Sequence, residues 1–242
     1  MIDPLLLTTA AVSTFNGTQG LTNATGFFFE RGRRLFFITS RHVVIDEPTG
    51  HRPDRIVIEI HIDLNNLAKS TQFSIPLYRD GKALWRQGVD AAGQIDVAVI
   101  EIDRKALPKS PAIRAFTPKQ LVDPGKHVVI GTDLVVVGFP LGFHDTLHHL
   151  PVARQAGLAS SFGLRFQGHG YFLTDARTHR GTSGAPVVMR IEKAGWGAKD
   201  LPWALLGVHS SRLDVSRDLK LDEALGLNCA WYADILLTLT EG

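Results

Sequence analysis

The chain has 242 residues, of which 44% are hydrophobic and 21% are charged, and its formal net charge at pH 7 is only +2. This balance is typical of a soluble globular protein, and so small and dispersed a charge argues against a nucleic-acid partner. No run approaches the roughly 18 apolar residues of a membrane span, and the single cysteine, Cys229, excludes an intramolecular disulfide.

The opening segment is apolar but lacks the pattern of a signal peptide. "MIDPLLLTTAAV" carries Asp3 where a signal peptide has positive charge, and its apolar run is short. A chain with one cysteine also needs no oxidising compartment. We therefore expect a cytoplasmic protein with no membrane partner.

Short apolar runs with a period of two residues follow one another along the chain and predict β-strands. In "DVAVIEI", for example, Ala98, Ile100 and Ile102 alternate with Val97 and Val99. Turn residues separate the runs, which favours an all-β barrel or sandwich. The predicted strands lie at 26–30, 35–39, 55–62, 96–102, 134–138, 152–160, 171–174, 185–191 and 204–210.

Four other segments do not fit the strand pattern. The run "RGRR" (31–34) predicts a solvated hairpin tip, and the Pro- and Lys-rich stretch 103–126 predicts a connection between two β lobes. Residues 192–202 predict a long hairpin loop. Only "YADILLTLT" (232–240) predicts a helix, which we expect to pack on the second lobe.

Three strings carry residues that can do chemistry together. "FFITSRHVV" ends a strand on His42, "QIDVAVIEI" begins one with Asp96, and "RGTSGAP" holds Ser183 in a glycine-rich turn. Each string alone is weak evidence for a catalytic site, because such residues are common in structural turns. Together they place His42 and Asp96 on an N-terminal lobe (1–110) and Ser183 on a C-terminal lobe (111–242), so that the site is the cleft between the lobes.

In these strings the chain resembles the trypsin/chymotrypsin-fold serine proteases, and most closely their disulfide-free HtrA-type and glutamyl-endopeptidase branches. Two further strings support the resemblance, "VVVGFPLG" (135–142) and "LLGVHSS" (205–211). It implies two six-stranded antiparallel Greek-key β-barrels, chymotrypsin-like, with a C-terminal helix. It also implies a serine endopeptidase that acts on protein or peptide substrates without a cofactor. HtrA proteins append a peptide-binding PDZ domain, for which we expect no room here.

The resemblance assigns a role to each residue of the motifs. Ser183 is the nucleophile, His42 is its general base and then the acid for the leaving amine, and Asp96 orients the imidazole. The backbone N–H groups of Gly181 and Ser183 form the oxyanion hole. Thr39 and Ser210 fall where the family has hydroxyls beside the aspartate, although both also fit as ordinary strand hydroxyls.

The substrate pocket is predicted from the same resemblance. Trypsins have an acid where this chain has Arg177, so a basic substrate residue should be rejected. Thr178 and His209 match the pair with which glutamyl endopeptidases and exfoliative toxins hold a glutamate, and Arg212 falls where the toxins have a lysine. We predict cleavage after Glu, with Asp or Gln as poorer substrates. The alternative is that the His209 side chain has only a structural role in its strand and that the side chains of both arginines point to solvent.

Other readings remain open at this point. The chain has Thr182 where secreted trypsins have an aspartate that pairs with a newly cut N-terminus, so we do not expect activation by that route. Whether a partner or oligomer activates the site is open. A binding or regulatory module with a silent or gated triad is the main alternative function, and an esterase is a weaker one. His144, His148 and His149 predict loop histidines rather than a metal site.

Overall fold

The structure, a computed structural model, describes residues 2–123, 128–191, 201–212 and 226–241. For Ser211 and Arg212 it describes the backbone alone. Most of the predicted loop at 192–202 lies outside the described residues. The described part of the chain is built from antiparallel strands with a few short helices, as the period-two pattern predicted.

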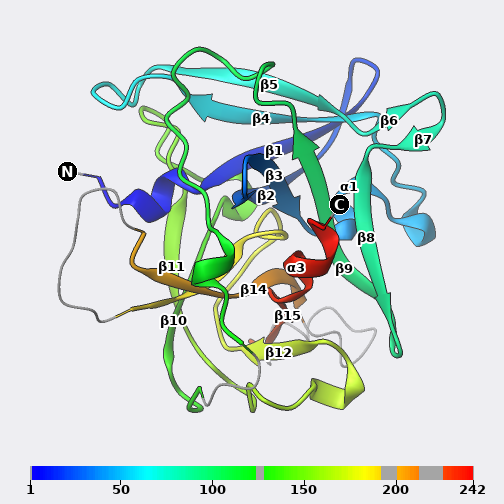
Figure 1. The fold of residues 1–242 in the computed structure, drawn as a ribbon, viewed down its shortest axis with the longest axis vertical. Coiled ribbons are helices and arrows are strands. Elements are labelled where there is room, and N and C mark those ends of the chain that lie inside the picture. The colour runs from blue at the N-terminus through cyan, green and yellow to red at the C-terminus, as the bar shows by residue number, and fades with distance from the viewer. Residues whose placement is uncertain (1, 124–127, 192–200, 213–225, 242) are drawn as a thin grey trace.

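The first sheet contains seven strands in the order β5-β4-β1-β2-β3-β9-β8. It occupies the upper half of Figure 1, in blue to green. A short helix, α1 (Arg41–Val44), follows β3. The strands are β1 (Thr9–Asn16), β2 (Gln19–Arg31), β3 (Arg34–Thr39), β4 (Arg55–His61), β5 (Ser70–Pro76), β8 (Trp85–Asp90) and β9 (Gly93–Ile102).

The seventh strand arises because a small hairpin interrupts one strand of the predicted six. Only the small hairpin of β6 (Tyr78–Arg79) and β7 (Lys82–Ala83) separates the edge strands β5 and β8 along the chain. An Asp-Gly turn makes this hairpin, with Asp80 at φ 50° and Gly81 at φ 75°. Because β5 pairs with β4 while β8 pairs with β9, the continuous chain joins the two edges and curls the sheet.

The second sheet has six strands, as predicted, in the order β11-β10-β13-β14-β15-β12. An isolated bridge between Leu158 and Thr174 joins the chain after β11 to β12 and so connects the two edges. The sheet lies in the lower half of Figure 1. Its strands are β10 (Asp133–Gly138), β11 (Val152–Gly157), β12 (Tyr171–Thr174), β13 (Pro186–Arg190), β14 (Trp203–Arg212) and β15 (Asn228–Tyr232).

Three apolar clusters form the core, one inside each sheet and one between the sheets. The alternation along β2 explains how they form, because Phe28 points into the first sheet while Phe27 and Phe29 pack between the sheets. Val97 and Val99 of β9 pack between the sheets in the same way. Strands with both faces buried therefore fix the two lobes against each other and hold the cleft in place.

The C-terminal helix, α3 (Ile235–Leu239), is present, but the expectation that it packs on the second lobe is incomplete. It lies against β8, and Leu236 and Leu239 join the cluster between the lobes. Figure 1 shows α3 beside β8 and β9. Among the described residues, no helix is long and apolar enough to cross a membrane.

The "RGRR" run forms a hairpin tip, but two of its arginines are held rather than freely solvated. Arg31 donates hydrogen bonds to the Leu237 carbonyl and the Thr240 hydroxyl at the end of α3. Arg34 pairs with Glu101 and also reaches the Thr240 carbonyl. Cations favour the carbonyl end of a helix, so these side chains tie the end of the second lobe to the first.

Candidate active site

His42 lies on α1, directly after β3, and faces Asp96 of β9. Its backbone N–H donates to Asp96 Oδ1 and its ring Nδ1 lies against Asp96 Oδ2, each at 2.8 Å. A carboxylate only accepts hydrogen bonds, so this contact places a proton on Nδ1 and leaves Nε2 as the basic nitrogen. The first lobe thus presents an oriented base.

Ser210 of β14 completes the surroundings of the aspartate from the second lobe. Its hydroxyl donates to Asp96 Oδ2 at 2.5 Å. Asp96 therefore accepts hydrogen bonds from both lobes, and three donors hold its two oxygens. Ser210 therefore lies beside the aspartate, as the resemblance led us to expect.

The pKa of His42 is raised above its ordinary value of 6.5. Burial lowers it, but the hydrogen bond and the charge of Asp96, with a smaller contribution from Asp46, outweigh that effect. The imidazolium form is therefore stabilised, which is what a base needs when it takes a proton during catalysis.

Ser183 lies on a tight loop that runs from Arg180 to Gly184. Gly181 and Gly184 adopt φ values of +91° and +86°, where a side chain would be strained. A Cβ on Gly184 would also collide with the Thr25 carbonyl and the Thr39 hydroxyl. Both glycines are therefore required by the backbone of the loop.

The same loop leaves two N–H groups unpaired. The Arg180 carbonyl accepts a hydrogen bond from the Leu141 N–H at 2.6 Å. The Gly181 N–H belongs to the same planar peptide group and therefore points in the opposite direction. Neither the Gly181 N–H nor the Ser183 N–H has an acceptor among the described residues. These are the two donors that the sequence predicts for an oxyanion hole, and the loop holds them available.

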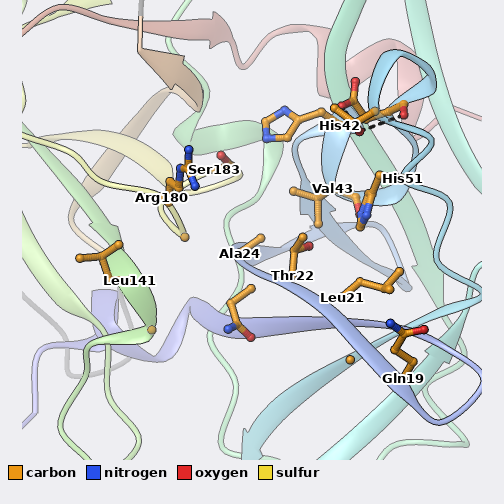
Figure 2. Close-up of a pocket in the computed structure, with 16 residues that line it drawn as sticks. Gln19, Leu21, Thr22, Ala24, His42, Val43, His51, Leu141, Arg180 and Ser183 are labelled. Atoms are coloured by element: carbon orange, nitrogen blue, oxygen red, sulfur yellow. Dashed lines mark hydrogen bonds between the residues drawn. The ribbon is translucent and has the colours of Figure 1, made fainter. Parts of the chain in front are cut away.

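Ser183 and His42 line one cavity of about 740 Å³. Figure 2 shows the two side chains on neighbouring walls of this cavity. No hydrogen bond joins them among the contacts of the described residues. Catalytic hydrogen bonds are often loose in a free enzyme and tighten when substrate binds.

The cavity continues from the two side chains as a groove. One wall is the N-terminal half of β2, and the opposite rim carries Leu141 and the exposed Arg180 (Figure 2). The sequence analysis did not identify Arg180, because nothing distinguished it from the neighbouring arginine at 177. The other lining residues are Gln19, Gly20, Leu21, Thr22, Asn23, Ala24, Val43, Asp46, Thr49, His51, Gly142 and Gly181.

Thr39 makes no hydrogen bond to Asp96 among the described residues, and it has the strand contact that the sequence left as the alternative. Its buried hydroxyl donates to the carbonyl of Thr25 at 2.7 Å. Thr39 is the last residue of β3, which pairs with β2, so the neighbouring strand supplies the acceptor. Thr25, in turn, contacts the serine loop, and the sequence analysis missed it because a threonine within a strand carries no motif.

The predicted pocket residues divide into buried and exposed ones. Thr178 is 5% exposed and donates its hydroxyl to Asn228 Oδ1 at 2.5 Å, and His209 is 2% exposed. Arg177 is exposed, and neither it nor Thr178 nor His209 lines the cavity beside Ser183. The Arg212 side chain lies outside the described residues, although its backbone pairs with Asn228 in β15. Asn228, which the sequence analysis missed, links the Thr178 side chain to this strand.

His209 is the most strongly perturbed of the described histidines. Burial, and then the neighbouring positive charge of His42, lower its pKa to about 4, against a smaller opposing effect of Asp96. It is therefore neutral at pH 7. Its Nδ1 is buried with no hydrogen-bond partner among the described residues.

The three loop histidines have ordinary structural contacts. His144 Nδ1 lies against the Gly142 carbonyl at 2.6 Å and its ring stacks on His149, while His148 pairs with Asp145. In the described part of the chain, no group of three His, Cys, Asp or Glu side chains is arranged to hold a metal ion. Cys229 is buried and free.

Comparisons with known proteins agree with this geometry. A family profile for the trypsin-like peptidase domain matches residues 24–193, more than half of the chain. Among solved structures, the chain is similar to a serine endoprotease from Yersinia pestis, with a TM-score of 0.54 and 15% sequence identity over 97% of this chain. This chain covers 62% of that one. A search of curated proteins gave no match.

At this level of identity the structural likeness concerns the fold. Together with the two curled antiparallel sheets, it confirms the all-β, chymotrypsin-like architecture predicted from the motifs. The family match covers parts of both sheets and includes the segments of His42, Asp96 and Ser183.

Proposed function

Since the chain belongs to the family of trypsin-like peptidase domains and is a serine protease by that membership, we propose that it cleaves peptide bonds through Ser183, His42 and Asp96. The observation that carries this proposal is the hydrogen-bonded pair of His42 and Asp96 beside a serine loop with two unpaired N–H groups. These are the base, the orienting acid and the oxyanion donors that acyl transfer requires.

The proposed reaction follows from these positions. Ser183 Oγ attacks the scissile carbonyl while His42 Nε2 takes its proton, and Asp96 stabilises the imidazolium that forms. The Gly181 and Ser183 N–H groups hold the oxyanion, each contributing about 3 kcal/mol to stabilisation of the transition state. His42 then gives the proton to the leaving amine, and water hydrolyses the acyl-enzyme by the reverse sequence.

The proposed preference for glutamate rests on the buried pair of Thr178 and His209. A buried polar atom without a partner calls for an explanation, and a glutamate side chain that enters beside these two residues would supply a partner for His209 Nδ1. A neutral imidazole donates one hydrogen bond to a carboxylate without repelling it. The Thr178 hydroxyl would turn from Asn228 to the same carboxylate. Arg177, being exposed, has no part in this pocket.

A peptide library cleaved by the purified protein tests both levels of the proposal, with Ser183→Ala as the control preparation. Cleavage that depends on Ser183 and follows Glu supports both. Cleavage after Lys, Arg or large apolar residues would remove the glutamate pocket and leave the protease assignment intact. Cleavage that persists in Ser183→Ala would remove the assignment itself.

The second candidate is a protease-fold module whose triad is gated by a partner. Its basis is that no hydrogen bond joins His42 to Ser183 among the described residues, an arrangement that a gated triad shares with a free active enzyme. Such a protein would bind peptides in the groove without cleaving them until a partner is added. Turnover by the isolated chain would exclude it.

A further inference from the structure

Thr25 of β2 is a buried first-lobe residue that holds several residues of the second lobe. Its side chain is 0% exposed. Its hydroxyl donates to the Gly181 carbonyl at 2.7 Å and accepts from the Phe139 N–H at 3.0 Å. Its backbone N–H donates to the Ser183 carbonyl at 2.9 Å. Thr25 thus spans the cleft to the nucleophile loop.

These contacts fix the direction of successive peptide groups in the loop. The Thr25 hydroxyl holds the peptide that follows Gly181, and the Thr25 N–H holds the one that follows Ser183. The peptide between them is held by the Ala185 N–H, which donates to the Thr182 carbonyl at 2.9 Å. Since a peptide group is planar, holding its carbonyl also sets its N–H.

The remaining peptide, between Arg180 and Gly181, is held by the Leu141 N–H. Leu141 is two residues after Phe139, whose N–H the Thr25 hydroxyl accepts. One hydroxyl therefore contacts both segments that orient the Gly181 N–H. Gly181 has no side chain to restrict its backbone, so rotation of this peptide would turn the Arg180 carbonyl toward the site.

We propose that Thr25 is a positioning residue that holds the Gly181 N–H in the oxyanion hole, through one hydroxyl bonded to both the Gly181 carbonyl and the Phe139 N–H. It touches neither the substrate nor the reacting atoms. The first lobe thus contributes to transition-state stabilisation as well as carrying the base. This inference rests on the proposed function of the same site.

Hydrolysis of 4-nitrophenyl acetate by Thr25→Val and Thr25→Ser tests it, with rates expressed per folded molecule. Removing one oxyanion donor outright costs roughly 100- to 1,000-fold in kcat. Loosening one should cost less, and we expect kcat to fall about 10- to 100-fold in Thr25→Val with KM changed less than about threefold. Thr25→Ser keeps the hydroxyl and should recover most of the rate.

Thr8→Val is the matched control. Thr8 is also 0% exposed, and its hydroxyl also donates to a backbone carbonyl at 2.7 Å, that of Leu5. None of its hydrogen bonds involves residues 180–184. It should lose stability in thermal unfolding without losing kcat. A purely structural role for Thr25 would make the two valine variants alike.

The outcomes separate the inference from the proposed function. If wild type hydrolyses the ester through Ser183 but Thr25→Val matches it, or if Thr25→Ser is equally impaired, the inference is wrong and the function stands. If Ser183→Ala hydrolyses the ester as fast as wild type, both are wrong. Should Thr25→Val fail to fold, the kcat of Thr25→Ala against Thr25→Ser decides in its place, and equal values would overturn the inference.

Discussion

Asp96 and His209 lie close enough to interact electrostatically, yet their polar groups are satisfied in opposite ways. Asp96 accepts hydrogen bonds from His42 and Ser210. His209, on the strand that supplies Ser210, has a buried Nδ1 without a partner among the described residues. The catalytic region proposed around Asp96 thus has its acid and base hydrogen-bonded before substrate arrives, whereas the pocket region proposed around His209 leaves a buried group for the substrate to satisfy.

The largest effect should come from breaking the catalytic region. Ser183→Ala should reduce kcat/KM for peptides roughly a millionfold, and His42→Ala by a similar factor, because the residues act as a unit. Asp96→Asn should be milder, at about 10⁴-fold, since it disturbs the tautomer of His42 but keeps its position. Steady-state rates checked against mock-purified protein measure this. Independent, additive losses would contradict a single catalytic unit.

The next largest effect should be a loss of folding stability in acid that arises from His209 in the pocket region. The pKa of His209 is about 4 in the folded protein and about 6.5 when unfolded, so the unfolded chain binds the proton more tightly. Its contribution is fully present above pH 6.5 and is lost as pH falls toward 4. The free energy of unfolding should then fall by about 3 kcal/mol across this window. Urea titrations of wild type and His209→Gln should diverge there, and parallel curves would contradict the buried neutral histidine.

Substrate preference should respond to the same residue by a smaller factor. His209→Ala should lower kcat/KM for a Glu peptide about 10- to 100-fold, because it removes one charge-assisted hydrogen bond. Hydrolysis of 4-nitrophenyl acetate should change little, since that ester has no side chain for the pocket. An equal loss on both substrates would place His209 in the catalytic region instead.

The smallest effect is a displacement of the pH profile. Because the pKa of His42 is raised, the proton must leave at a pH above 6.5 before the base can act, and kcat/KM should rise through that higher value. Asp96→Asn removes the charge that raises the pKa, so its residual activity should rise at lower pH. If the acid side of the pH profile is the same in Asp96→Asn as in wild type, Asp96 does not set the pKa of His42.

The sequence predicted the catalytic region better than the pocket region for a physical reason. His42, Asp96 and Ser183 are fixed by local turns and by glycines that the backbone requires, and these leave motifs in the sequence. The hydroxyls of Thr39 and Thr178 instead donate to Thr25 and Asn228, which lie 14 and 50 residues away along the chain, and no local pattern reveals such partners.

The fold shows the same division between local and distant contacts. The period-two runs identified nine of the strands but missed β1, β5, β8 and β15. The hairpin at 78–83 interrupts one first-lobe strand and splits it into β5 and β8. The contact of α3 with the first lobe depends on Arg31 and Arg34, whose partners lie some 200 residues along the chain. Sequence spacing cannot predict such contacts.

Labelling by a fluorophosphonate probe at pH 8, read by intact mass and peptide mapping, tests the central claim most directly. The claim is that His42 and the two oxyanion donors activate Ser183 in the isolated chain. We predict one label per molecule, on Ser183, absent in Ser183→Ala and strongly slowed in His42→Ala. Folded wild-type protein that stays unlabelled, or that carries the label on another residue, would contradict it.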